Sequence, residues 1–248
     1  MKNIIKRDLK AIWSKSKKFL LLHLLIILML QIMIFMGGIN PLEVFLEFTR
    51  DQGYITSLSG FFPPVAWLLL QLIPTSVFSM ALYNDHVENA SYMVLKSESK
   101  YKYFFSKLIV CFLLTFAINF LLYVFLSINL FFYKEFSIEN IRIMNRIIGS
   151  YFISQFLLIV IAYLVSIKIG YKFALSINLI FLIISMTSNS KWVLGQQTLA
   201  FKQDVLGGYI TLKDSIIVWL AYTFILLVCG YFIFKTYNFY GGENDWSK

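Results

Sequence analysis

The feature that most constrains this chain is a series of apolar runs, each close to the length needed to cross a lipid bilayer as a helix. A helix needs about 20 apolar residues, at about 1.5 Å per residue, to span a hydrocarbon core of about 30 Å. The runs lie at 19–37, 61–83, 104–132, 147–167, 172–188 and 215–235. The chain is also 59% hydrophobic and only 14% charged, whereas soluble domains average roughly 45–50% and about 25%. We therefore expect an all-α integral membrane protein, with six transmembrane helices forming a single domain over residues 1–248.

Two local features divide or bend these runs. Gly170, flanked by Lys168 and Lys172, predicts a tight turn, so that the fourth and fifth runs form two helices rather than one. Pro74 lies inside the second run, where it removes one backbone donor and predicts a kink. The kink is either a packing feature or a hinge, and the carbonyl that it frees needs a donor from a nearby hydroxyl or a neighbouring helix.

The basic residues favour one orientation in the membrane. With the N-terminus inside, the inner segments hold 15 Lys and Arg and the outer segments hold seven. Because Lys and Arg accumulate on the cytoplasmic side, we expect a multi-pass protein of the cell membrane with both termini in the cytoplasm. The formal charge of +9 then reflects this orientation, and we expect no nucleic-acid partner.

The N-terminal segment, 1–18, holds seven Lys or Arg against one acid, Asp8. Apolar residues recur in it at helical spacing, at Ile5, Leu9, Ile12 and Trp13. This pattern predicts an amphipathic interface helix that lies on the membrane surface with a basic outer face. The alternative is a disordered basic tail.

Two of the expected outer segments are unusually apolar. The sequence PLEVFLEFTRD at 41–51 predicts a short amphipathic helix. The segment 189–214 keeps many apolar residues and is interrupted by Gly195 and by the pair Gly207 and Gly208, which argues against a solvated loop. We expect short re-entrant-like helices there, either dipping into the outer leaflet or lying on its surface.

The interiors of the spans carry polar but uncharged residues, apart from their interfacial ends. Ion-driven pumps usually place ionisable groups near the middle of the membrane, so the chain is not expected to power transport by itself. The polar or kinking residues predict contacts between helices or the lining of a translocation path, and they are Gln31, Gln71, Pro74, Thr115, Asn119, Gln155 and Asn178.

Several catalytic motifs are absent from the sequence. No Gly-Lys dipeptide occurs, so there is no Walker A loop, and only two histidines exist, so an HExxH metal site is excluded. No GxSxG sequence is present, and both cysteines lie inside apolar runs. We therefore expect no enzymatic activity, no metal and no cofactor in this chain.

The segment 78–107, between the second and third runs, is polar, carries charges of both signs and has a helix-forming composition. Asp85 or Glu88, the small pair Ala90-Ser91, the aliphatic pair Val94-Leu95, Ser99-Lys100 and Lys107 follow one another in it. With six helices and both termini inside, this order resembles the permease subunits of type-2 ABC transporters, although the glycine typical of that family is replaced by Asn89.

The resemblance implies a coupling helix at 84–103 that docks on a separate cytoplasmic ABC ATPase, which would hold the ATP and Mg. It also implies a second permease copy, or a homologous permease, as a dimer partner within the lipid membrane. The residues expected to dock are Asp85, His86, Glu88, Asn89, Ser91, Tyr92 and Met93, with Tyr101 and Lys102 at the edge. The alternative is a solvated loop that only holds the helix ends.

The cargo is indicated only by the resemblance and by composition. Richness in Phe, Ile, Asn and Lys is typical of low-GC Gram-positive bacteria, where small permeases of this kind often export amphipathic or antimicrobial peptides, such as bacteriocins and phenol-soluble modulins. We expect a peptide exporter. The competing hypotheses are a non-transporting sensor, immunity or assembly subunit, and a membrane enzyme acting on lipid.

Overall fold

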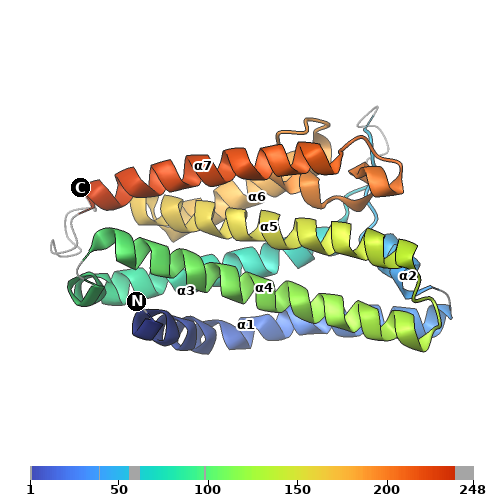
Figure 1. Cartoon of the computed structure of the whole chain (residues 1–248), viewed down its shortest axis with the longest axis horizontal. Helices are drawn as coiled ribbons and strands as arrows, with labels where there is room; N and C mark the ends of the chain where they lie inside the picture. The colour runs from blue at the N-terminus through green and yellow to red at the C-terminus, as the bar shows by residue number, and fades with distance from the viewer. Residues whose placement is uncertain (1, 39, 56–61, 98, 238–248) are drawn as a thin grey trace.

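The computed structural model describes residues 2–38, 40–55, 62–97 and 99–237, and within these ranges the chain is almost entirely helical. The long helices run lengthwise beside one another as a bundle (Figure 1). The elements are α1 (Lys2–Gly37), α2 (Pro41–Phe48), α3 (Val65–Ser97), α4 (Lys100–Phe132), α5 (Ile138–Ile169), α6 (Tyr171–Thr187), the short 3-10 helices η1 (Leu194–Thr198), η2 (Ala200–Lys202) and η3 (Asp204–Leu206), and α7 (Leu212–Thr236).

Five helices of the described chain are long and apolar enough to cross a membrane: α1 through its part Leu20–Gly37, α3, α4, α5 and α7. The sixth expected span corresponds to α6, which is apolar but has only 17 residues. At about 1.5 Å per residue α6 is about 26 Å long, slightly less than a typical hydrocarbon core. The prediction of an all-α membrane protein is therefore confirmed with five suitable helices, and the turn at Gly170 is confirmed as the boundary between α5 and α6.

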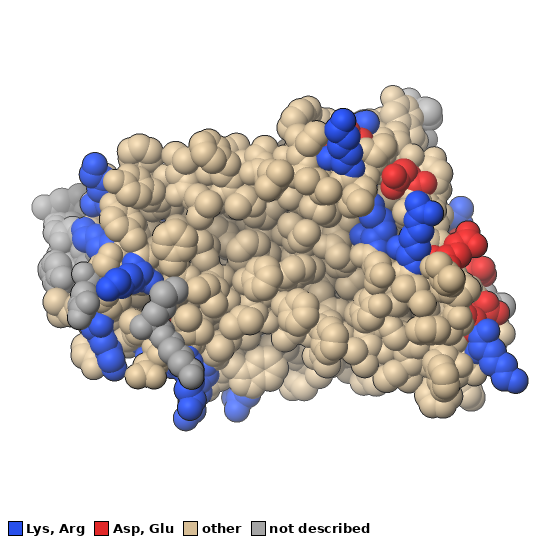
Figure 2. Space-filling model, in the orientation of Figure 1, with Lys and Arg blue, Asp and Glu red and all other residues tan. Residues whose placement is uncertain are grey.

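The bundle has two distinct ends (Figure 1). The start of α1, the end of α7 and the connections α3–α4 and α5–α6 lie at one end, which we call the terminal end. The α2 helix lies at the opposite end, which we call the α2 end. Figure 2 shows Lys and Arg at the terminal end, a mixture of basic and acidic residues at the α2 end, and an uncharged belt between them.

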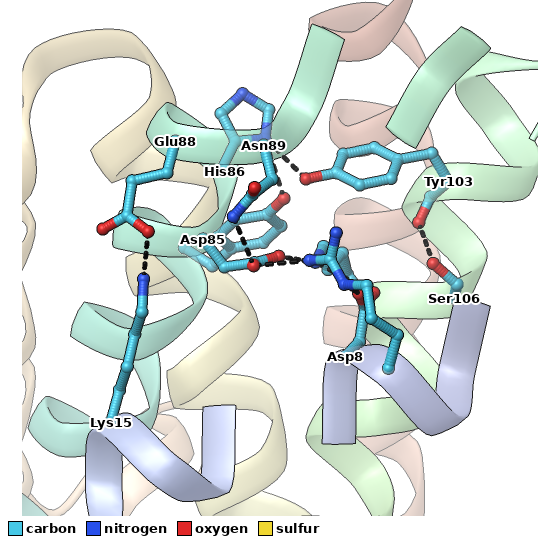
Figure 3. A network of polar contacts seen from close by, with 11 residues as sticks. Asp8, Lys15, Asp85, His86, Glu88, Asn89, Tyr103 and Ser106 are labelled. Carbon is cyan, nitrogen blue, oxygen red and sulfur yellow. Dashed lines mark hydrogen bonds and ion pairs between the residues drawn. The ribbon is translucent and has the colours of Figure 1, made fainter. Parts of the chain in front are cut away.

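The N-terminal segment differs from its prediction, because residues 2–18 are helical but are continuous with the first span in α1. Ser16 donates its hydroxyl to the Ile12 carbonyl at 2.7 Å, a contact that keeps the helix intact and often bends it. In Figure 3 the turns that carry Asp8 and Lys15 run across α3 and α4. Ile4 and Ile12 are buried, so this amphipathic helix turns its apolar side toward protein.

The expected coupling helix at 84–103 is also not a separate element. The α3 helix continues to Ser97 and α4 begins at Lys100, so the segment consists of two helix ends that meet at a sharp corner. No glycine or proline interrupts 84–97, which explains why the helix continues. Ser99 then caps α4, with its hydroxyl accepting the Tyr101 N–H at 3.3 Å.

The α2 end is closed by the two apolar segments recognised in the sequence. The short helix expected at 41–51 is confirmed as α2, which starts at Asn40 as N-cap and buries Phe45. The segment 189–214 contains the three short helices η1, η2 and η3, joined by turns and irregular chain. Leu194 and Leu199 are buried. Lys202 is buried as well and donates to the Ser188 carbonyl at 2.7 Å. Burial lowers the pKa of Lys202 to about 8.

Gly208 permits the close packing of this segment. A Cβ at position 208 would collide with the backbone of Lys202 and Gln203. The backbone cannot withdraw easily, because Lys202 accepts the Ile210 N–H at 2.8 Å and Gln203 accepts the Gly208 N–H at 2.9 Å.

We expect Gly208→Ala to destabilise the protein by about 1–3 kcal/mol, the usual cost of forcing extra volume into a packed site. Gly149→Ala in α5 is the matched control, since a Cβ at position 149 meets nothing within 4 Å and alanine favours a helix over glycine. Denaturant titration in detergent measures both variants. Equal midpoints for the two would show that the approach at Gly208 does not limit stability.

Candidate functional site

The end of α3, the start of α4 and the first turns of α1 meet at the terminal end of the bundle (Figure 3). With 33 residues, α3 is about 50 Å long, which exceeds a hydrocarbon core of about 30 Å. One crossing needs about 20 residues. The helix is therefore about 13 residues longer than a single crossing requires.

Four charged residues from three helices form a cluster here, and we call Arg7, Asp8, Asp85 and Lys107 the charge cluster. Asp8, Asp85 and Lys107 are buried, whereas the Arg7 side chain is 31% exposed. Figure 3 labels the two carboxylates, Asp8 and Asp85. The Lys107 ammonium on α4 lies 2.9 Å from an Asp8 carboxylate oxygen and also pairs with Asp85. Arg7 Nη2 lies 2.5 Å from Asp85 Oδ1, and Arg7 Nε lies 3.0 Å from Asp8 Oδ1. The side chains of Asp8, Asp85 and Lys107 are fully buried, so each charge depends on the others for compensation.

The pairing holds two like charges at one site. Asp8 and Asp85 would repel each other without the cations between them. Burial raises the pKa of Asp8, and the nearby Lys107 and Arg7 charges oppose this shift. Asn89, one turn after Asp85, donates its amide to Asp85 at 3.0 Å and stabilises the charged carboxylate. The cluster thus joins α1, α3 and α4 electrostatically.

Aromatic residues surround the neighbouring His86, and their contacts connect the helices of the charge cluster to α5 and α7. The His86 Nδ1 atom lies 3.1 Å from the Tyr163 hydroxyl of α5, and Phe234 of α7 packs edge-on at 5.9 Å between ring centroids. Tyr103 packs against the same imidazole, and the Lys107 ammonium lies 4.9 Å above the Tyr103 ring. Five helices therefore converge on this part of the bundle.

The residues expected to dock on an ATPase divide into buried and exposed groups. Asp85, His86 and Met93 are buried between helices and do not belong to the exposed surface, and docking on an ATPase stays a prediction. Asn89 and Tyr101 are half-buried. The exposed members of the set are Glu88, Ser91, Tyr92 and Lys102.

The exposed side of the α3 end is supported by α1. Glu88 forms an ion pair with Lys15 of α1, with 2.5 Å between Oε2 and Nζ. At the start of α4, Tyr101 stacks on Tyr231 of α7 with 4.9 Å between ring centroids. The corner is therefore anchored on both sides.

The backbone carbonyl that Pro74 leaves without a donor has a hydrogen-bond partner in the structure. Proline cannot donate to the carbonyl four residues earlier, and that carbonyl, on Leu70, accepts the side-chain amide of Gln155 on α5 at 3.0 Å. The Gln155 oxygen in turn accepts the amide of Asn119 on α4 at 2.8 Å. This chain of hydrogen bonds links α3, α5 and α4 in the middle of the bundle.

The other polar residues of the spans also fit contacts within and between helices. Gln31 of α1 and Asn129 of α4 exchange two amide hydrogen bonds, at 3.2 and 3.0 Å. Asn178 of α6 donates to the Leu158 carbonyl at 3.4 Å, and Thr115 donates to the Cys111 carbonyl of its own helix at 2.8 Å. Gln71 is fully buried, and its side chain has no hydrogen-bond partner among the described residues.

Arg7, Asp8 and Lys107 were not assigned to a site from the sequence. The available signals were that Asp8 is the single acid among seven basic residues and that Lys107 lies inside an apolar run.

Within the described ranges, no group of three or more His, Cys, Asp or Glu could hold a metal ion. No protein-family model, curated protein or solved structure matches the chain.

We expect Lys107→Met to destabilise the protein by about 3–5 kcal/mol, because it leaves Asp8 and Asp85 buried together with insufficient positive charge. The control is Lys15→Met, which breaks the partly exposed pair with Glu88 and should cost less than about 1 kcal/mol. Adding Asp8→Asn to Lys107→Met should restore part of the loss. Unfolding in detergent measures all three, and similar losses for Lys107→Met and Lys15→Met would contradict a compensated buried cluster.

We expect Gln155→Leu to cost about 1–2 kcal/mol, because hydrogen bonds between membrane helices are worth about this much and the Leu70 carbonyl would lose its donor. Gln155→Leu combined with Pro74→Ala should cost less than the two changes separately, because alanine restores the backbone donor for Leu70. If the losses in free energy of unfolding are additive in the double variant, the hydrogen bond from Gln155 does not compensate for the donor that Pro74 removes.

Proposed function

We propose that this chain is the membrane subunit of an ATP-driven exporter and that α3 and α4 receive force from a separate ATPase at the terminal end. In this proposal α6 is the sixth span, both termini are cytoplasmic, and two permease copies form the complete pore. The positive-inside rule supports the orientation, since Lys and Arg gather at the terminal end while the α2 end also carries acids (Figure 2).

The observation that carries the proposal is an exposed stripe on the part of α3 beyond the membrane. Glu88, Ser91, Tyr92 and Leu95 are all exposed and follow the spacing i, i+3, i+4 and i+7, and we call them the docking stripe. A helix that inserts into a groove of a partner uses this spacing for its anchors. Tyr92 and Leu95 are each more than 60% exposed, which supplies apolar contact area between polar neighbours.

The charge cluster gives the stripe a means of transmitting motion. Asp85 lies one turn before Glu88 on the same helix and is held by Arg7 of α1 and Lys107 of α4. A push on the stripe therefore displaces α1 and α4 together with α3. ATP and Mg would be bound by the partner, and this chain would convert closure of the ATPase into movement of its spans.

The proposed cargo is an amphipathic peptide. The uncharged belt in Figure 2 and an aromatic content of 18% suit an apolar or amphipathic molecule better than an ion or a sugar. The polar groups within the spans are uncharged amides, and several are hydrogen-bonded, as Gln31 and Asn129 are to each other, which is consistent with energy entering at the membrane surface rather than through a charged relay.

The test is co-purification with a candidate ABC ATPase, sought first among the genes beside this one, together with its ATP hydrolysis in lipid. Glu88→Lys and Tyr92→Ala should each reduce co-purification several-fold and lower the stimulation of ATP hydrolysis. The matched control is Trp192→Ala, an equally exposed aromatic residue of the segment between α6 and α7, which should change neither quantity.

If both stripe variants co-purify with the ATPase as well as the unmodified protein does, the docking stripe is not the binding site. If no ATPase associates with the unmodified protein, the chain is better explained as a non-transporting sensor or immunity subunit.

A further inference from the structure

The first turns of α1 carry an exposed stripe on the side that faces away from the bundle. Four exposed residues follow one another at the spacing i, i+4, i+7 and i+11, and we call them the lysine stripe: Lys6, Lys10, Trp13 and Lys17. At about 100° per residue, these positions fall within an arc of about 60° on the helix surface. The buried Ile4 and Ile12 lie on the other side of the helix.

The three lysines of the stripe carry charges that the protein does not compensate. Within the described ranges they form no ion pair, because the nearby acids have other partners. Asp8 and Asp85 belong to the charge cluster, and Glu88 is paired with Lys15. The Trp13 side chain among these lysines is 49% exposed. The stripe therefore presents three positive charges and one indole ring to its surroundings.

The contacts of α1 show in which direction this segment runs. Arg7 and Lys15 are eight residues apart, which is about 12 Å along α1. Their partners, Asp85 and Glu88, are only three residues apart, about 4.5 Å along α3. In Figure 3 the turn that carries Lys15 lies beside α3, and the turn that carries Asp8 lies toward α4. The segment therefore crosses α3 and α4 instead of running along them.

This crossing places the lysine stripe at the level of the lipid headgroups. The apolar span of α1 begins at Leu20, three residues after Lys17. Because the segment crosses the membrane-spanning α3, it runs close to the membrane plane from the point where α1 leaves the hydrocarbon core. The α3 helix continues nine residues beyond Glu88, to Ser97, so the end of the bundle lies further out. Trp and Lys are both suited to this depth, since each has an apolar body and a polar tip.

We propose that the lysine stripe binds the headgroups of anionic phospholipids, with phosphates at the three ammonium groups and the Trp13 ring in the interface beside them. Attraction between clustered lysines and an anionic leaflet is electrostatic and needs no pocket. Ile4 and Ile12 pack against protein, so this attachment does not use the apolar face of the helix. It holds the part of α1 that carries Arg7 and Asp8, and so stabilises the charge cluster. The proposal requires only a membrane with anionic lipid and does not depend on the proposed exporter function.

The test uses two photoreactive phospholipids with the same acyl chains and a diazirine beside the headgroup, one a phosphatidylglycerol and the other a phosphatidylcholine. The full-length protein is placed in phosphatidylcholine nanodiscs with a small amount of either probe, and the adducts are mapped by mass spectrometry. The phosphatidylglycerol probe should label residues 3–17 several-fold more than the phosphatidylcholine probe does. This preference should shrink in 1 M salt, where the Debye length falls to about 3 Å.

Two variants and a matched control separate the stripe from the overall charge of the protein. Lys6→Gln, Lys10→Gln and Lys17→Gln together should bring the labelling of 3–17 by the two probes close to equality. The same three positions changed to Arg keep the charge and should keep the preference. The control removes three other exposed lysines, lowers the net charge equally and should leave the preference unchanged, and it consists of Lys96→Gln, Lys172→Gln and Lys235→Gln.

Equal labelling of 3–17 by both probes in the unmodified protein, or a preference that the Gln variant of the stripe retains, would overturn the proposal. If neither probe labels this segment and the Gln variant loses co-purification with the proposed ATPase, the stripe contacts protein instead of lipid, and the proposal fails. A headgroup preference in a protein for which no ATPase is found supports the lipid site and removes only the exporter.

Discussion

The buried ion pairs of Lys107 with Asp8 and Asp85 are the interaction on which the arrangement of the terminal end depends. Taking three charges out of water is costly, and it is tolerable only when each charge has a close partner. The geometry supplies these partners from three different helices, with Arg7 completing the set. The pairing therefore specifies which helices meet at the terminal end. Apolar packing specifies this less well, because apolar contacts between helices and with lipid are nearly equivalent.

A different kind of contact holds the middle of the bundle. There the spans are joined by amide hydrogen bonds, of which the link from Asn119 through Gln155 to the Leu70 carbonyl is anchored at a proline kink. Charged groups are thus concentrated at the edge, and neutral polar groups are used in the interior. Such a distribution is suited to a protein that is moved by contacts at one surface, because the interior can shift without separating buried charges.

Much of the fold could be predicted from residue patterns, and the reasons for the exceptions are physical. Apolar runs located the long helices, Gly170 marked the boundary between α5 and α6, and the pattern at 41–51 located α2. The patterns did not show that α1 and α3 continue past the membrane edge, because basic and mixed-charge residues without glycine or proline suit both a continued helix and a separate surface helix. The charge cluster was missed because Asp8, Asp85 and Lys107 are far apart in sequence, and pairing between distant helices leaves no local periodicity. Asp85 and His86 were expected on the surface, but their partners bury them.

The central claim is that the start of α1 and the end of α3 move as one body because the charge cluster joins them. The direct test is a spin-label distance between exposed positions Lys10 and Lys96, each changed to Cys in a chain whose Cys111 and Cys229 are replaced. The distance distribution should be narrow and should stay the same when the proposed ATPase and ATP are added, and it should broaden when Lys107→Met is introduced. A broad distribution in the otherwise unmodified chain, or one that Lys107→Met leaves unchanged, would contradict the account.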